Sequence, residues 1–136
     1  MSCNIPGMER EGAHVLVVDD DDGLRELLTD YLSGHGFRVG AVADGSSAAP
    51  ACAELEAEVV VIDYRLPDVD GAEVAEAVRD RCPGASVVFL SASAGREEHE
   101  AARSSGAPLV RKDEGVDALV DAVRAAAASS FQGGVP

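Results

Sequence analysis

Short apolar runs alternate with longer amphipathic segments along this chain. The runs consist mainly of Val, Ile and Leu, and they predict strands at 14–18, 37–42, 59–63, 86–90 and 109–111. Near-continuous apolar runs of this length are typical of strands that are buried on both faces of a parallel sheet. The alternation of such strands with helical segments predicts an α/β fold.

The segments between the runs predict helices. The first contains residues at helical spacing that we expect on one buried face: Leu24, Leu27, Leu28, Tyr31 and Leu32. The second, at 44–56, contains Pro50, which predicts a late start or a kink because proline is tolerated mainly in the first turn of a helix. The segment 95–105 is polar and has only a weak apolar face, so we expect it to be marginally held. Further helices are expected at 72–81 and 116–129.

Repeated strand–helix units predict one doubly wound parallel sheet. We expect a flavodoxin-like, five-stranded sheet with strand order 2-1-3-4-5 and helices on both faces. Residues 13–130 should form this domain, with 1–12 as a flexible N-terminal arm and 131–136 as a frayed tail. Ligands of such sheets bind at the carboxyl ends of the strands.

The composition narrows the classes of function. The chain has 25 Asp and Glu residues against 11 Lys and Arg residues, for a formal net charge of −14. Such a surface repels phosphate backbones and anionic lipids, which excludes unspecific nucleic-acid or membrane binding as a main activity. Three cysteines without metal-ligand spacing predict reduced thiols, and the sequence shows no leader or apolar span. We therefore expect a soluble, cytoplasmic protein.

The apolar runs end at polar residues that a parallel sheet would bring to one edge. These residues are Asp19, Asp20, Asp63, Ser91 and Lys112. Neighbouring carboxylates repel one another, so one must keep its proton or a cation must lie among them. Oxygen ligands select a hard cation such as Mg²⁺, which also accepts a phosphate oxygen. Lys112 adds a positive charge suited to a phosphoryl group.

Together these residue types indicate phosphoryl transfer to a carboxylate. An aspartate can be phosphorylated on its oxygen to give an aspartyl-phosphate. The transfer requires positioning and charge neutralisation, which a metal site, a lysine and a hydroxyl would supply. Each residue alone is weak evidence, because an aspartate after a strand is more often a helix cap or turn residue. The order and spacing of the whole set carry the prediction.

The sequence resembles the receiver domain of bacterial two-component response regulators. The resemblance covers roughly residues 13–129 and rests on four segments: VLVVDDD at 15–21, VIDYRLPDVDG at 61–71, FLSA at 89–92 and RKD at 111–113. The pattern Asp-x-x-x-Pro-x-x-Asp-Gly after a buried strand is the most specific of these. It implies that Asp63 is the phosphoacceptor.

The same resemblance implies a set of metal ligands. Asp19 and Asp20 match the acidic pair that holds Mg²⁺, Asp20 directly and Asp19 through water. Asp63 also contributes to this site. Arg65 lies where the family uses a backbone carbonyl as a further ligand.

The remaining implied roles lie at the ends of the fourth and fifth strands. Ser91 matches the switch hydroxyl that moves toward the phosphoryl group, and Ala92 matches the small residue that leaves its entry open. Lys112 matches the lysine that pairs with the phosphate.

Two positions depart from the family pattern. Asp113 follows the lysine where the family has a proline with a cis bond, so we expect a trans Lys112–Asp113 peptide. Leu109 stands where the family often has the aromatic residue coupled to the switch hydroxyl. Either this coupling is altered or Leu109 packs against the neighbouring helices. We hypothesise that signalling still uses the helix at 95–105, because weakly packed elements switch most readily.

The resemblance implies a signalling switch that catalyses only its own phosphorylation and dephosphorylation, and not a turnover enzyme. The expected donor is a sensor histidine kinase or a histidine phosphotransfer protein. The output would be a changed contact with a downstream protein or a homodimer formed on phosphorylation, with no direct contact to nucleic acid or membrane. Whether a longer protein carries an effector domain is left open by the sequence.

Alternative functions fit fewer of the residues. A receiver fold could act as a phosphorylation-independent interaction module. Asp20-Asp21-Asp22-Gly23 also fits the Asp-x-Asp-Gly opening of haloacid-dehalogenase-like phosphohydrolases, but that family would not explain 63–71. Dinucleotide binding is weaker still, because four aspartates replace the glycine-rich turn after the first strand.

Overall fold

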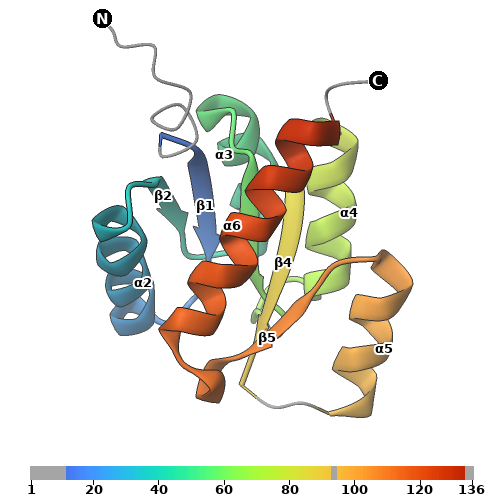
Figure 1. The fold of residues 1–136 in the computed structure, drawn as a ribbon. Helices are drawn as coiled ribbons and strands as arrows, with labels where there is room; N and C mark the ends of the chain where they lie inside the picture. The colour runs from blue at the N-terminus through green and yellow to red at the C-terminus, as the bar shows by residue number, and fades with distance from the viewer. Residues whose placement is uncertain (1–11, 93–94, 134–136) are drawn as a thin grey trace, which may run out of the picture.

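The computed structural model describes residues 12–92 and 95–133 and contains one five-stranded parallel sheet (Figure 1). The strand order is β2-β1-β3-β4-β5, as predicted. The strands are β1 His14–Val18, β2 Arg38–Val42, β3 Val59–Asp63, β4 Ser86–Ser91 and β5 Leu109–Arg111. All neighbouring pairs run parallel.

Helices follow the strands and cover both faces of the sheet. They are α2 Asp22–Gly34, α3 Ala48–Leu55, α4 Gly71–Arg81, α5 Arg96–Ser105 and α6 Val116–Gly133. Two short 3₁₀ turns, η1 Gly45–Ser47 and η2 Lys112–Glu114, precede α3 and α6. Figure 1 shows α6 in front of the sheet and α3 behind it.

The apolar runs are continuous because each central strand packs on both sides. Val15 and Val17 belong to the core beneath α2 and α6, whereas Leu16 and Val18 belong to the core beneath α3, α4 and α5. All four side chains are fully buried. Successive side chains of a strand point to opposite faces, so a strand covered on both sides cannot show a polar alternation.

Three details of the helices differ from the sequence-based expectation or refine it. Leu27 is 52% exposed, so its expected burial with Leu28 and Leu32 is wrong. The buried stripe of α2 is narrower because the helix packs at the edge of the sheet, against β2, β1 and α6. Pro50 is the third residue of α3, which confirms the late start. Helix α6 continues to Gly133, beyond the expected end near Ser129.

The expectations for the two ends of the chain and for the cysteines concern residues that the structure describes only in part. The expected arm lies outside the described residues apart from Gly12, and the expected tail does so for 134–136, whereas 131–133 are helical. Cys52 is buried, Cys82 is half-buried and both are free, and Cys3 is not described. Among the helices of the described part, none is long and apolar enough to cross a membrane.

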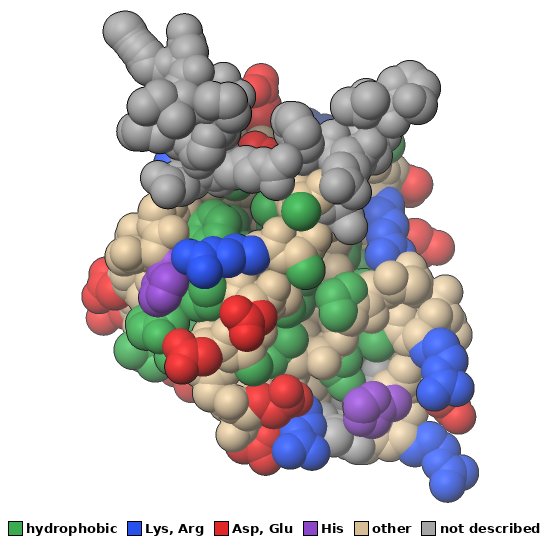
Figure 2. All heavy atoms as spheres, viewed as in Figure 1, with side chains coloured by type: hydrophobic (Ala, Val, Ile, Leu, Met, Phe, Trp, Pro, Cys, Tyr) green, Lys and Arg blue, Asp and Glu red, His purple; other side chains and the backbone are tan. Residues whose placement is uncertain are grey.

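Acidic side chains gather at the end of the molecule to which the strands point. On the face drawn in Figure 2, several acidic side chains lie around the start of α6, and Lys and Arg side chains are spread over this face, some of them beside α5. The first turns of α2, η2 and α6 contribute acidic residues at this end: Asp22, Asp113, Glu114 and Asp117. These first turns therefore add negative charge around the carboxyl edge of the sheet.

Candidate functional site

The structure brings the polar strand ends to the same edge of the sheet. Asp19 and Asp20 follow β1, Asp63 ends β3 and Ser91 ends β4. Asp63 pairs in register with Leu90, so Ser91 lies one residue further along the neighbouring strand. Ser91 pairs in turn with Arg111, which directly precedes Lys112. Parallel register alone thus places five separated residues around one point.

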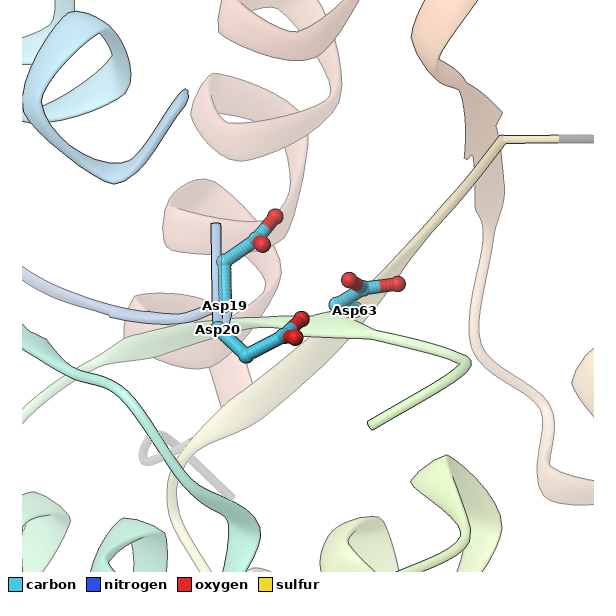
Figure 3. A group of neighbouring side chains, drawn as sticks. All are labelled: Asp19, Asp20 and Asp63. Carbon is cyan, nitrogen blue, oxygen red and sulfur yellow. The ribbon is translucent and has the colours of Figure 1, made fainter. Parts of the chain in front are cut away.

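Three carboxylates form the centre of this site (Figure 3). Oxygen atoms of Asp19, Asp20 and Asp63 lie within 4.8 Å of one another. Asp19 and Asp63 are buried and Asp20 is exposed. In Figure 3 the side chain of Asp20 points toward that of Asp63. The group is close enough for one cation to contact all three residues, and it is open on the side of Asp20.

Asp19 is held by the start of the following helix. Its Oδ1 accepts a hydrogen bond of 2.9 Å from the backbone N–H of Asp21, and its backbone carbonyl accepts one of 2.8 Å from the guanidinium of Arg25. Asp19 Oδ2 is buried and has no hydrogen-bond partner within the described part of the chain. The nearest positive group is the Lys112 ammonium at 3.5 Å, so this buried oxygen has capacity left to bind a cation.

Lys112 bridges two of the three carboxylates. Its Nζ lies 3.3 Å from Asp63 Oδ2, where it donates a hydrogen bond, and 3.5 Å from Asp19 Oδ2, where it forms an ion pair. Burial lowers the pKa of Lys112, but the charges of Asp63 and Asp19 outweigh this and hold the pKa above its ordinary value. Lys112 is therefore a fixed positive charge beside Asp63.

The surroundings of Asp63 disfavour its ionised form. Burial, followed by the charge of Asp19, raises the pKa of Asp63 from 3.8 to about 6, although Lys112 and the backbone N–H of Arg65 oppose the shift. One lysine thus does not neutralise the site. A divalent cation among the carboxylates would favour the ionised form of Asp63.

This pKa predicts a pH-dependent stability without metal. Folded protein keeps a proton on Asp63 up to about pH 6, whereas the unfolded chain releases it near 3.8. The resulting stability is fully present below pH 3.8 and is lost as the pH rises through 6. Relative to Asp63→Asn, wild type should lose about 1–3 kcal/mol of unfolding free energy between acidic and neutral pH. Urea unfolding across this range measures it, and parallel pH profiles of the two proteins would contradict it.

The loop after β3 folds back on itself. The backbone N–H of Gly71 donates to the carbonyl of Tyr64 at 3.1 Å, and Arg65 and Asp70 form an antiparallel bridge. The N–H of Arg65 donates to Asp63 Oδ1 at 3.2 Å. Asp70 caps α4 by accepting from the N–H of Ala72. The closed loop keeps Arg65 beside Asp63, as the sequence pattern requires, while the metal-binding role of its carbonyl stays a prediction.

Gly71 is required by the closure of this loop. A Cβ at Gly71 would lie 2.8 Å from both the Cα and the carbonyl oxygen of Tyr64, which are backbone atoms that cannot rotate away. We expect Gly71→Ala to lower the free energy of unfolding by about 1–3 kcal/mol. Gly34→Ala is the matched control, because a Cβ at Gly34 meets nothing within 4 Å. Chemical denaturation measures both, and an equal effect of the two substitutions would refute the steric explanation.

The two departures near Lys112 are resolved by local packing. No cis peptide bond occurs in the described residues, so the Lys112–Asp113 bond is trans, as predicted. The 3₁₀ turn η2 takes the place of the proline: Glu114 Oε2 accepts from the N–H of Arg111 at 3.0 Å, and the Arg111 guanidinium pairs with Asp113. Leu109 is half-buried and packs against the core beneath α3, α4 and α5.

The position of Asp22 does not support the phosphohydrolase alternative. The side chain of Asp22 is 87% exposed and pairs with Arg25, away from the carboxylate cluster. The Asp-x-Asp-Gly opening therefore does not build a site here. Arg25 itself was not singled out by the sequence, although an arginine one helical turn into α2 is well placed to reach the end of β1.

Comparisons with known proteins agree with this geometry. A family model described as "Response regulator receiver domain" matches residues 15–124. Over 112 residues the chain is 35% identical to the "Probable transcriptional regulatory protein TcrX" of Mycobacterium tuberculosis, covering 82% of this chain and 48% of that protein. Over 85 residues it is 39% identical to the "DNA-binding response regulator MtrA" of Mycolicibacterium smegmatis, covering 62% of this chain and 37% of that protein.

These relatives are longer than the chain, which spans between about a third and a half of their length. Because their names describe DNA-binding or transcriptional regulators, they do not support the expectation of no direct contact with nucleic acid.

Solved structures show the same fold. The HemR receiver domain of Leptospira biflexa superposes with a TM-score of 0.75 at 28% identity, covering 85% of this chain and 94% of that chain. The chemotaxis protein CheY4 of Vibrio cholerae superposes with a TM-score of 0.77 at 24% identity, covering 85% of this chain and 98% of that chain.

Proposed function

This chain belongs to the response regulator receiver domain family, and we therefore propose that it accepts a phosphoryl group on Asp63 from a phospho-histidine. The observation that carries the proposal is the position of Lys112 Nζ, which lies 3.3 Å from Asp63 Oδ2 beside a cluster of three carboxylates. A buried carboxylate with a fixed cation at its side is arranged to accept and hold an anionic group.

The donor set fits Mg²⁺. All side-chain ligands are carboxylate oxygens, and the buried Asp19 Oδ2 lacks a hydrogen-bond donor. Asp19, Asp20 and Asp63 would hold the ion together with the backbone carbonyl of Arg65. When bound, Mg²⁺ supplies positive charge that screens the carboxylates from the incoming phosphoryl oxygens.

The chain's own residues then direct the transfer. An Asp63 oxygen forms a bond to phosphorus while the bond from phosphorus to the donor imidazole nitrogen breaks, and the imidazole keeps that electron pair. Lys112 moves its hydrogen bond from Asp63 to a phosphoryl oxygen. The Ser91 hydroxyl donates to another phosphoryl oxygen, and Ala92 leaves the approach to Asp63 open.

Hydrolysis resets the switch. Water attacks phosphorus, inorganic phosphate leaves and the carboxylate of Asp63 is restored. The protein thus catalyses only its own phosphorylation and dephosphorylation. The proposed donor is a sensor histidine kinase or a histidine phosphotransfer protein. The output is a changed contact with a downstream protein, a second copy of this chain or, as the names of the relatives suggest, a DNA-binding partner domain.

The test is labelling by a small-molecule donor. Incubation with acetyl phosphate and Mg²⁺ should add one phosphoryl group to the peptide that contains Asp63, as read by mass spectrometry. A modification on a peptide without Asp63, or none under these conditions, would contradict the proposal.

A further inference from the structure

Asp68 attaches the tip of the loop after β3 to another segment of the chain. The contacts among Tyr64, Arg65, Asp70 and Gly71 close the same loop at its base. The two carboxylate oxygens of Asp68 accept from two successive backbone N–H groups: Oδ1 from Gly45 at 3.0 Å and Oδ2 from Ser46 at 3.1 Å. These donors belong to η1, the turn after β2, and lie more than twenty residues away in the sequence. The contact therefore joins two separate connections at the carboxyl edge of the sheet.

The η1 turn packs directly on this loop. A Cβ at Gly45 would lie 2.8 Å from Val74 Cγ2 and 3.2 Å from Val69 Cβ, so the backbone of η1 approaches the residue that follows Asp68. The N–H groups of Gly45 and Ser46 hold the pKa of Asp68 below its ordinary value. The carboxylate is thus ionised at neutral pH, when both oxygens can accept hydrogen bonds.

The loop is consequently held at its base and at its tip. At the base, Gly71 donates to Tyr64 and Arg65 bridges to Asp70. At the tip, Asp68 is bound to η1. Both attachments thus restrict the loop backbone between Arg65 and Asp70.

We infer that Asp68 is a positioning residue that fixes the loop backbone at Arg65 in the orientation needed for metal binding and for the reaction of Asp63. This inference rests on the proposed function, because it assigns the Arg65 carbonyl to the metal site. Residues that orient metal ligands commonly contribute about 10–100-fold to metal affinity. Asp68 touches neither the carboxylate cluster nor Lys112 in the described structure, so its effect must pass through the loop.

The chain offers a matched control at the same turn. Asp44 caps η1 by accepting from the N–H of Ser47 at 2.9 Å. Within the described residues it shares no hydrogen bond with the loop after β3, although its charge repels that of Asp68. Asp44→Ala removes a half-buried carboxylate that caps η1, and Asp68→Ala removes an exposed carboxylate that joins η1 to the loop. Both should lower the melting temperature by a similar amount, roughly 2–6 °C. Only Asp68→Ala releases the loop.

The experiment is calorimetric titration of Mg²⁺ into each protein, with acetyl phosphate labelling in parallel. We expect Asp68→Ala to raise the dissociation constant for Mg²⁺ about tenfold and Asp44→Ala to change it by less than about twofold. Asp68→Asn keeps one acceptor oxygen, so its dissociation constant for Mg²⁺ should lie between those of Asp68→Ala and wild type. If Asp68→Ala fails to fold, the comparison is made with Asp68→Asn.

Unchanged Mg²⁺ affinity in Asp68→Ala would overturn the inference, and so would equal losses in Asp68→Ala and Asp44→Ala, because these would reflect only the stability of η1. Failure of the proposed function has a different signature. Wild type would then bind Mg²⁺ without being labelled on Asp63, and the difference between the two variants in Mg²⁺ affinity would still decide the role of Asp68.

Discussion

Replacing Asp63 with Asn is expected to abolish labelling of this protein by acetyl phosphate and Mg²⁺. The carboxylate is the proposed nucleophile, and an amide neither attacks phosphorus nor offers the anionic oxygen that Lys112 contacts at 3.3 Å. We expect the labelling rate to fall at least about a hundredfold, or about 3 kcal/mol in activation free energy. Intact-protein mass spectrometry over a time course measures this loss.

The control for this substitution is Asp30→Asn. Asp30 is exposed on α2 and lies outside the carboxylate cluster, so this variant makes the same chemical change away from the site. Labelling of Asp30→Asn should match wild type. Full labelling of Asp63→Asn would refute the assignment of the phosphoacceptor.

Asp20→Ala is expected to raise the Mg²⁺ requirement sharply. Asp20 is the exposed member of the cluster and the residue that we propose as the direct side-chain ligand at its open side. Its loss leaves Asp19 and Asp63, which are already engaged by Lys112. We expect at least about a tenfold increase in the Mg²⁺ concentration for half-maximal labelling.

Measuring the labelling rate as a function of Mg²⁺ concentration distinguishes weaker Mg²⁺ binding from a general loss of folded protein. At saturating Mg²⁺ the labelling rate of Asp20→Ala should recover part of its loss, whereas that of Asp63→Asn should not. Asp30→Ala should follow the wild-type titration curve. If Asp20→Ala binds Mg²⁺ with wild-type affinity in calorimetry, Asp20 is not a ligand.

The substitution of proline by Asp113 shows how the fold preserves a functional geometry by another route. Without a proline, the peptide after Lys112 is trans. The turn is held instead by Glu114, which accepts from the N–H of Arg111, and by the pairing of Arg111 with Asp113. Lys112 nevertheless reaches Asp63 and Asp19. These supporting contacts are exposed to solvent, so each contributes modestly to stability.

The sheet and the identity of the central residues could be predicted from the sequence. Continuous apolar runs such as 59–63 are required by strands buried on both faces, and parallel strands bring their carboxyl ends to one edge. Asp19, Asp63 and Lys112 were therefore recognisable as neighbours before any geometry was known. The exposure of Leu27 was not predictable in the same way, because helical spacing defines a face but not how much of that face the neighbouring elements cover.

The sequence alone determined the order of strands and helices, the acidic character of the chain and the set of residues at the strand ends. Only the tertiary structure decided which of these side chains are buried, and hence that burial and Asp19 raise the pKa of Asp63 to about 6. It alone joined Asp68 to Gly45 and Ser46. The reason is physical: local patterns encode which face of an element is apolar, whereas desolvation and long-range hydrogen bonds depend on segments that meet only when the sheet has formed.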